Sequence, residues 1–437
     1  MHNLFLILLA ILCIAMFFVR RELKLGILFF SCICLYEYEL PIIFGKCVQI
    51  LPICFFLSER KKVIGLIREN KNKIFSAVFL LAFIYIILTI INSPYLQLGR
   101  APIVYMVDQF FSRYFLLLAA IICIHDRKDL DLLFRMIFFS VIVMSFFAIW
   151  NFITVHSVYV DWLFQGREVA DYLEDAGNMY SNSSRFRVQG TFHNAFDYGY
   201  TCLACLLLFL YGRSVHIVKK SHFVIVLFFT LFGILTCGCR TLLITSLVSL
   251  MVYSFIYYDI KKYIMFMGGF LMLFFFLSNF IPEIDNLYIS IMSVFGDDTN
   301  IQGSSIDMRL LQFASVIGYI QDNLLFGRGV GFFANDLGFS GGRAGLVDKS
   351  LFGMEGSYLM SLLETGIVGT ILYFGIIIIC LCWGLRLRKI NRESASLLFS
   401  VFLAFLVFGI LTGELRSAFI TFLVASVAIC NIKINIV

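Results

Sequence analysis

The sequence predicts an all-α, polytopic integral membrane protein. Of its 437 residues, 61% are hydrophobic and only 14% are charged, which is more apolar surface than one soluble core of this size could bury. Apolar runs of roughly 20 residues recur along the chain, and this is the length that crosses a bilayer as a helix. The thirteen cysteines lie mostly within these runs, where we expect them to behave as small hydrophobic residues.

Clusters of basic residues indicate which ends of the apolar runs face the cytoplasm. The firmest cluster is ERKK at 59–62, and others lie near 127, 219, 261 and 386. Consecutive clusters enclose pairs of apolar runs, so each pair leaves the cytoplasm and returns. The expected spans are 74–92, 104–124, 133–154, 197–212, 222–237, 241–258, 263–281, 366–385, 395–412 and 418–434.

The first 58 residues hold either two spans, one of them long and interrupted near Pro41, or three short ones. Arg20, Arg21 and Lys24 favour three spans. However, the stretch 25–57 has only 33 residues, which is short for two complete crossings. We therefore expect two spans here, about twelve transmembrane helices in all, and both termini in the cytoplasm.

In this topology two long loops face outward, at 155–196 and 282–365. The second loop has ten acidic and four basic residues, the reverse of the cytoplasmic loops, as the positive-inside rule expects. The chain thus divides into an N-terminal transmembrane bundle over 1–281, which includes loop 155–196, a large periplasmic loop over 282–365, and C-terminal transmembrane helices over 366–437.

Two segments place arginine at the outer boundary. SSRFRVQGTFHNAFDYG, 183–199, brings Arg185, Arg187, His193 and Asn194 to the entrance of a helix. TCGCRTLL, 236–243, puts Arg240 in the outer turn of a tight helical hairpin. Arginine can hold a phosphate through two parallel hydrogen bonds. The alternatives are a solvated loop for the first segment and an arginine that snorkels to the interface for the second.

A third segment, SSIDMRLLQFASVIGYIQDNLLFGRGVGFF at 304–333, predicts an amphipathic helix on the outer surface. Its apolar residues at helical spacing are Leu310, Leu311, Phe313, Ala314, Ile317 and Ile320, and Arg309 stands near its start. The helix is expected to end at the glycine turn FGRGVG, because glycine permits positive φ. Packing on the membrane bundle is sufficient to explain most of these residues.

The fourth segment, GMEGSYLMSLLETGIVG at 353–369, places Glu355 directly before a membrane run, among residues too small to shield it. Gly366 and Gly369 are spaced for close approach of another helix. Packing therefore explains these glycines, whereas Glu355 needs a different explanation. An ordinary solvated glutamate is the alternative.

In order and spacing, the four segments resemble the O-antigen polymerase (Wzy-type) and O-antigen ligase superfamily. RVQGTFHN is similar to an Arg, Gly-Thr-Phe, Asn pattern, and TCGCRTLL to a Ser-Arg-Thr/Gly hairpin, with Cys239 where serine is usual. The third segment resembles an Asp-x-x-Arg helix before a Pro-Leu-x-Gly-x-Gly turn, here without the proline. The fourth resembles an Asn-x-Tyr-Leu segment that ends in Glu-x-Gly-Ile-x-Gly. Glu355 stands where family ligases carry a histidine, which is more like the polymerases.

The resemblance implies a glycosyltransferase of the bacterial inner membrane, with its active face in the periplasm. Donor and acceptor would both be undecaprenyl-diphosphate-linked oligosaccharides, and a chain-length regulator and a flippase would be partners; no nucleic acid is expected. Glu355 and Arg240 become the catalytic candidates. Arg187, Arg185, Arg309, His193, Asn194 and Tyr358 become candidates for binding the diphosphate or sugar. No cofactor and no metal are expected, because the outer loops contain no suitably placed Asp-x-Asp.

Three other functions remain open at this point. A ligase would transfer finished polymer to lipid A-core, and Glu355 argues against it. A flippase for the same lipid-linked units belongs to another class, and it predicts charged residues buried in mid-span and broken helices in matched halves. A purely structural subunit would need no arginine at the outer face.

Overall fold

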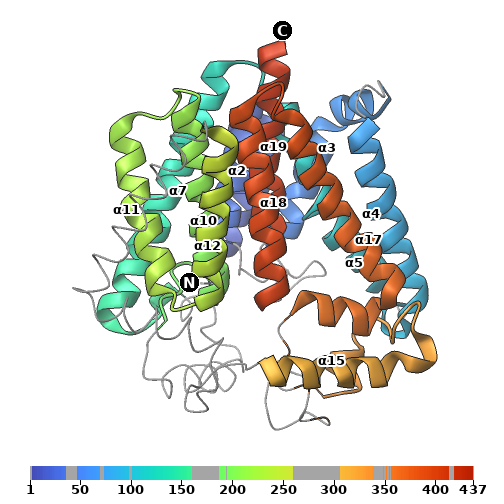
Figure 1. The fold of residues 1–437 in the computed structure, drawn as a ribbon. Coiled ribbons are helices and arrows are strands. Elements are labelled where there is room, and N and C mark those ends of the chain that lie inside the picture. Colours follow the sequence, from blue (N-terminus) through green and yellow to red (C-terminus); the bar gives the residue numbers. More distant parts are fainter. Residues whose placement is uncertain are drawn as a thin grey trace.

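The computed structural model describes residues 2–35, 47–68, 73–97, 101–159, 187–192, 194–258, 306–338, 348, 351, 354, 356–412 and 418–436. Within these ranges every regular element is a helix (Figure 1). Seven of the helices are long and apolar enough to cross a membrane, and three more apolar helices are shorter. The prediction of an all-α, multi-pass membrane protein is confirmed. The number of about twelve spans stays a prediction, because the expected span 263–281 lies outside the described ranges.

Fourteen α-helices carry the description that follows. They are α1 (His2–Phe18), α2 (Arg21–Cys34), α3 (Cys47–Arg68), α4 (Lys73–Asn92), α5 (Ala101–Phe111), α6 (Ala119–Cys123), α7 (Arg127–Thr154), α10 (Ala195–Ser214), α11 (Lys220–Thr236), α12 (Arg240–Tyr257), α15 (Ile306–Ile320), α17 (Ser357–Leu387), α18 (Arg392–Thr412) and α19 (Ala418–Ile436). Short helical turns are η1 (Pro94–Gln97), η2 (Tyr114–Leu118), η3 (Gln321–Asn323) and α16 (Phe332–Asn335).

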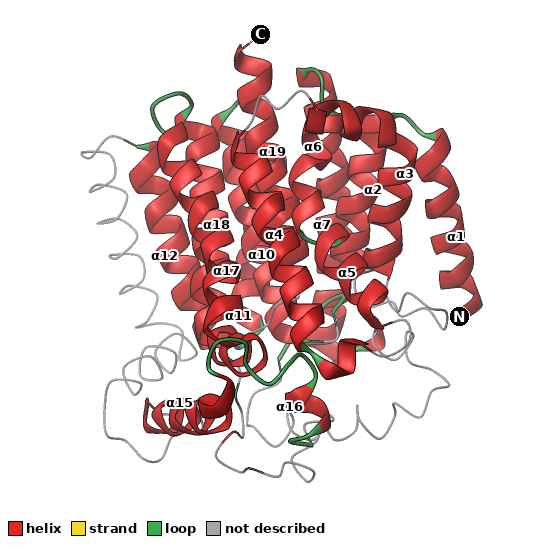
Figure 2. Cartoon of the chain, turned by 90° about the vertical axis from the view of Figure 1, so that its right-hand side faces the viewer, coloured by secondary structure: helices red, strands yellow, loops and turns green. Residues whose placement is uncertain are grey.

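The bundle has two distinct ends. The helix α15 lies across one of them, which we call the α15 end, and the C-terminus lies at the other, which we call the opposite end (Figures 1 and 2). Basic side chains gather at the opposite end. Lys62 Nζ lies 2.8 Å from His125 Nε2, and Arg127 donates to the carbonyl oxygens of Val215 and His216. From these basic residues the positive-inside rule predicts that the opposite end faces the cytoplasm.

The N-terminal region contains three helices, α1, α2 and α3, whereas two spans were expected in the first 58 residues; the number of spans there stays a prediction. Helix α3 continues through the ERKK cluster to Arg68 and lies antiparallel to α2. Glu59 of α3 accepts a bond from Lys24 Nζ at 2.6 Å and from Arg21 Nε at 3.1 Å, both near the start of α2. The stretch 25–57 holds parts of two helices because α2 has only 14 residues and α3 extends past residue 58.

Helix α10 lies at the centre of the bundle and is almost entirely buried. Its small residues let neighbours approach closely. A Cβ on Gly199 would lie 2.3 Å from a side-chain carbon of Leu242 in α12. On another side, the hydroxyls of Tyr200 and Thr421 lie 2.7 Å apart and join α10 to α19. A rigid α10 therefore fixes the positions of α12 and α19, which flank the site described below.

The predicted helix of the third segment is confirmed as α15, and most of the apolar residues that define its pattern are exposed in the protein. Of the six apolar residues named for it, only Ile320 is buried, whereas Leu310 and Leu311 are each 61% exposed. The buried side consists of Gln312, Val316 and Ile320. Val316 and Ile320 join a small apolar cluster with Leu359 and Leu363 at the start of α17. The helical spacing of apolar residues identified the helix, but it did not show which side of the helix is buried.

Two expected spans have a different form. The run 104–124 is not one helix, because α5 ends at Phe111 and a 3-10 turn, η2, separates it from α6. The run expected at 366–385 begins earlier, at Ser357, and α17 is kinked at Gly366, where φ is +66°. The other described spans begin and end within a few residues of the prediction.

Candidate functional site

The segment that carries Arg187 runs along the α15 end of the bundle and is held by backbone contacts. Val188 N donates to Thr236 O at 3.1 Å, and Gln189 N donates to Asn151 Oδ1 at 2.8 Å. Gly190 has φ of +59°, and a Cβ there would lie 2.7 Å from the Tyr198 ring. The Gly-Thr-Phe pattern thus has a structural reason, since it fixes Arg187 against the end of α11.

Arg187 is half-buried and packs on the turn that contains Arg240. Its guanidinium carbon lies 5.4 Å from the centre of the Phe196 ring, within the range of a cation–π contact. A Cβ on Gly238 would lie only 3.1 Å from Arg187 Cγ, and Gly238 itself has φ of +64°. Glycine is therefore required where the two segments touch. Gly238 lies two residues before Arg240, so this contact places Arg187 beside the Arg240 turn.

Arg240 begins α12, directly after the turn between α11 and α12, as the sequence predicts. Cys239 precedes it as the N-cap but its thiol caps no backbone N–H; it lies 3.0 Å from Thr241 Oγ1. Burial raises the pKa of the nearby Cys237 thiol, which therefore remains neutral beside Arg187. The turn thus presents arginine charge that these thiols do not offset.

The last turn of α18 joins this hairpin to the start of α17. The hydroxyls of Thr241 and Thr412 are hydrogen-bonded, which links α12 to α18. Ser357 Oγ donates to Gly409 O at 2.6 Å, which links α17 to α18. Tyr358 follows Ser357 and is half-buried against the small apolar cluster around α15. The structure therefore brings three of the four segments together around one helix end.

A backbone clamp connects the FGRGVG turn to the kink of α17. Gly327, Gly329 and Gly331 all have positive φ, as predicted for this turn. Four bonds cross to the kink: Arg328 N to Leu363 O, Gly329 N to Glu364 O, Ile367 N to Leu324 O and Val368 N to Leu325 O, at 2.8–3.1 Å. They satisfy groups that the kink removes from the helix. Glu364 Oε1 also accepts from Gly331 N at 3.0 Å, so this carboxylate orders the turn.

The clamp corrects the interpretation of Gly366 and Gly369 as sites of close helix approach. A Cβ on Gly366 would lie 2.5 Å from Gly327 N and Leu325 O, which belong to a loop. A Cβ on Gly369 would meet Thr365 of the same helix at 2.3 Å. Both glycines are therefore needed for the kink of α17. The sequence spacing of small residues is the same for a kink and for close packing of another helix, so it could not separate the two.

The predicted site residues fall into three groups. Arg187, Arg240 and Tyr358 lie on segments that converge as described. Asn194 is the N-cap of α10, where its Oδ1 accepts from Phe196 N at 2.6 Å, so its described contact is structural. Arg185, His193 and Glu355 lie outside the described residues, as does the side chain of Arg309 at the start of α15.

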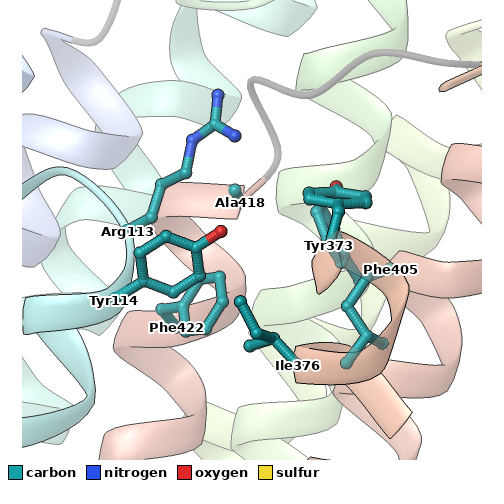
Figure 3. Close-up of a pocket in the computed structure, with 8 residues that line it drawn as sticks. Arg113, Tyr114, Tyr373, Ile376, Phe405, Ala418 and Phe422 are labelled. Carbon is teal, nitrogen blue, oxygen red and sulfur yellow. The ribbon is translucent and has the colours of Figure 1, made fainter. Parts of the chain in front are cut away.

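Arg113 was missed by the sequence analysis. It lies in the break between α5 and η2, within the run expected to be a plain membrane span. Tyr114, Tyr373 and Ala418 line the same pocket (Figure 3). The signal was available, because an ionisable residue inside a membrane run is a functional candidate by default. Averaging over a strongly apolar window concealed it. Within the described residues no group of three or more His, Cys, Asp or Glu is placed to hold a metal ion.

Comparison with known proteins gives one family match. The family described as O-Antigen ligase matches residues 225–374, about a third of the chain. The match spans the Arg240 hairpin, α15, the glycine turn and the kink of α17. Residues 225–374 are therefore similar to this family. The resemblance found in the sequence is thereby confirmed at the superfamily level. Curated proteins provide no match to the chain.

Proposed function

We propose that this superfamily member polymerises undecaprenyl-diphosphate-linked oligosaccharide repeat units into O-antigen or a related surface polysaccharide. The reaction takes place at the periplasmic face of the inner membrane, which corresponds to the α15 end. The observation that carries the proposal is the meeting of the Arg187 segment, the Arg240 hairpin and the start of α17 around the last turn of α18.

Arg187 and Arg240 act on the leaving group. When the donor's anomeric carbon separates from the diphosphate oxygen, negative charge develops on the diphosphate. Arginines fixed beforehand stabilise that charge without reorganisation. This electrostatic role supports transfer without a divalent metal. Arg309, Arg185 and His193 are further contacts for the diphosphate or the sugar, and Asn194 orders the segment between them.

Glu355 acts on the acceptor. It holds the attacking sugar hydroxyl and takes its proton while the new bond to the anomeric carbon forms and the bond to the diphosphate breaks. Direct displacement inverts the anomeric centre. General-base assistance of this kind contributes about a hundredfold to ten-thousandfold. Glu355 lies one residue before Gly356, whose close contact with Ile410 O fixes the chain near the last turn of α18.

A second candidate is the ligase reaction, which the description of the matched family favours. The glutamate at 355, where family ligases carry a histidine, supports the polymerase instead. The flippase alternative gains one observation, the broken span at Arg113. However, Arg187 and Arg240 lie at one end of the bundle rather than in mid-span, and this favours chemistry at that end.

The test is a lipopolysaccharide gel from a strain that lacks the gene and is complemented with wild type, Glu355→Gln or Arg240→Ala. We expect core with a single repeat in the deletion lane, a ladder with wild type, and little or no ladder with either variant. Bare core with lipid-linked polymer accumulating would indicate the ligase. Bare core with unpolymerised lipid-linked units retained inside the cell would indicate the flippase. A full ladder from both variants would contradict their catalytic roles.

A further inference from the structure

A polar cavity lies at the opposite end of the bundle, between α7 and α11. Its volume is about 130 Å³, roughly ten times the space that one water molecule needs. Two of its polar side chains, Asp131 and Arg135, come from α7, and two more, Lys219 and His222, come from the start of α11. The rest of the lining is apolar and includes the buried ring of Phe209 from α10. The proposed function uses none of these residues.

The charges that line this cavity leave it with a net positive charge. Asp131 is balanced by Arg135, whose Nη2 lies 2.6 Å from the carboxylate Oδ2. Lys219 has no such balance, because its ammonium forms no ion pair or hydrogen bond with any described residue. The ring of His222 stacks on Phe138 with the ring centres 4.5 Å apart, and within the same residues its nitrogens form no hydrogen bond. An ammonium and an imidazole N–H are therefore available to a ligand in the cavity.

The lysine at the cavity also stands where the helix dipole disfavours it. Lys219 is the N-cap of the 17-residue helix α11 but its side chain caps no N–H, Lys220 is the first residue of the helix, and the first turn contains no acidic residue. A helix N-terminus carries roughly half a positive charge and exposes backbone N–H groups. Two exposed lysines add to this potential instead of offsetting it. An anion in the cavity would be attracted by the lysines and by the helix end together.

The residues next to the cavity on the membrane side are apolar and exposed. Phe139 follows Arg135 by four residues on α7 and is 61% exposed, and Ile225 follows His222 by three residues on α11 and is 38% exposed. Residues at this spacing lie on one face of a helix. Both helices run from the opposite end toward the α15 end (Figure 1), so Phe139 and Ile225 lie deeper in the membrane than the cavity. A ligand with an anionic head and apolar chains matches both parts of this surface.

We propose that this cavity binds the phosphate headgroup of an anionic phospholipid from the membrane leaflet at the opposite end. Lys219, His222 and the first N–H groups of α11 donate to the phosphate oxygens, and the acyl chains lie along Phe139 and Ile225. Basic pockets between membrane helices on the cytoplasmic side are known to hold lipid headgroups. A zwitterionic headgroup fits less well, because its own ammonium would meet the two lysines. This inference does not depend on the proposed function.

The experiment measures binding of phosphatidylglycerol to the full-length protein in detergent by native mass spectrometry. We expect Lys219→Gln to weaken the tightest binding step about fivefold, the usual effect of one basic residue at an anionic lipid surface. His222→Phe keeps the ring stacked on Phe138 but loses its N–H, and should weaken binding about twofold to tenfold. Lys219→Arg keeps the charge and should bind like wild type. The matched control is Lys128→Gln, an exposed lysine of α7 at the same end that does not line the cavity.

Other ligands show what the cavity prefers. Phosphatidylethanolamine should bind more weakly than phosphatidylglycerol, and inorganic phosphate should not displace the bound lipid. Equal binding of the two lipids would overturn the preference for an anionic headgroup. Displacement by inorganic phosphate would show a site for free anions and would overturn the assignment to a lipid.

The variants test the position of the site. Equal losses in Lys219→Gln and Lys128→Gln would overturn the proposal, because they would indicate a general effect of surface charge. Wild-type binding in both Lys219→Gln and His222→Phe would overturn it as well. Phosphatidylglycerol should also raise the melting temperature of wild type more than that of Lys219→Gln, since a ligand stabilises the state that binds it. The same melting curves show that each variant folds, and Lys219→Gln decides the question if His222→Phe does not.

Discussion

At the residue scale, the surroundings of Arg187 and the position of Arg240 explain why these two residues are arginines and not lysines. Arg187 lies over the Phe196 ring and packs on Gly238, and Arg240 begins α12 just beyond. A planar guanidinium can stack on a ring and still direct two donors at one phosphate. Lysine at either position keeps the charge but loses the fork and the stacking.

We therefore expect Arg187→Lys and Arg240→Lys each to lower the rate of chain extension by about tenfold or more, and the alanine variants by about a hundredfold to a thousandfold. The measurement is kcat/KM with a purified lipid-linked repeat unit in nanodiscs. Arg135→Lys, at the opposite end, should retain the wild-type rate. Lysine variants as active as wild type would mean that these arginines supply charge without specific geometry.

The site residues differ in how far the sequence could predict them. Arg240 was placed correctly, because two apolar runs separated by three residues leave room only for a tight turn. Arg113 was missed, since one charge in a long apolar window barely changes its average. Asn194 was expected to bind substrate, yet its described bond caps α10. An N-cap and a ligand contact use the same residue types, so composition alone does not separate them.

At the element scale, the kink of α17 and the FGRGVG turn form one unit. The four backbone bonds between them exist only because the helix opens at Gly366. Val330 N also donates to Ser93 Oγ at 2.8 Å, so the unit is attached to the end of α4. The first turns of α17, including Tyr358, are thereby held apart from the membrane-crossing part of the same helix. This arrangement keeps the site end of α17 fixed against α18.

Gly366→Ala should break this unit. The substitution forces alanine into a backbone region that is essentially restricted to glycine and brings its Cβ to 2.5 Å from Gly327 N. We expect a loss of about 3 kcal/mol or more, measured as a lower melting temperature of the protein in detergent. Gly375→Ala in the same helix is the control. Nothing lies within 4 Å of that Cβ, so it should be neutral or stabilising by up to about 1 kcal/mol. Equal melting temperatures would contradict the clamp.

The sequence predicted where helices occur more reliably than where they end or which helices contact one another. Long apolar runs identified most of the described spans to within a few residues. In the N-terminal region α3 includes ERKK as helix, and Glu59 of that motif pairs with Lys24 and Arg21 of α2. That pairing is a tertiary contact, and a window of sequence treats the same residues as a loop. The buried side of α15 could not be predicted for a similar reason, since its partner is the distant start of α17.

At the scale of the whole molecule, the two ends of the bundle carry different tasks. The opposite end gathers basic residues that fix the orientation in the membrane. The α15 end carries the converging segments, and Arg113 points toward it from within a span (Figure 3). A substrate with a lipid tail and a charged headgroup fits such an arrangement, because the tail stays in the bilayer while the diphosphate meets the arginines at that end.

The three N-terminal helices suggest a prediction that differs from the topology expected from the sequence. Helix α1 starts toward the α15 end and the C-terminus lies at the opposite end (Figures 1 and 2), so we expect the termini on different sides of the membrane rather than both in the cytoplasm. The charged residues Arg20, Arg21 and Lys24 then lie at the cytoplasmic end, as the positive-inside rule requires. We expect a short epitope tag at the N-terminus to be cleaved when intact spheroplasts are treated with protease.

A tag at the C-terminus should resist protease until the cells are lysed, which serves as the internal control. Both tagged proteins must first complement the deletion strain, so that a displaced terminus is not mistaken for the native one. Protection of both tags would restore the two-span arrangement of the first 58 residues. Two crossings from a cytoplasmic N-terminus and three from a periplasmic one both bring the chain to the cytoplasmic start of α4, so either result keeps Arg240 at the proposed periplasmic face.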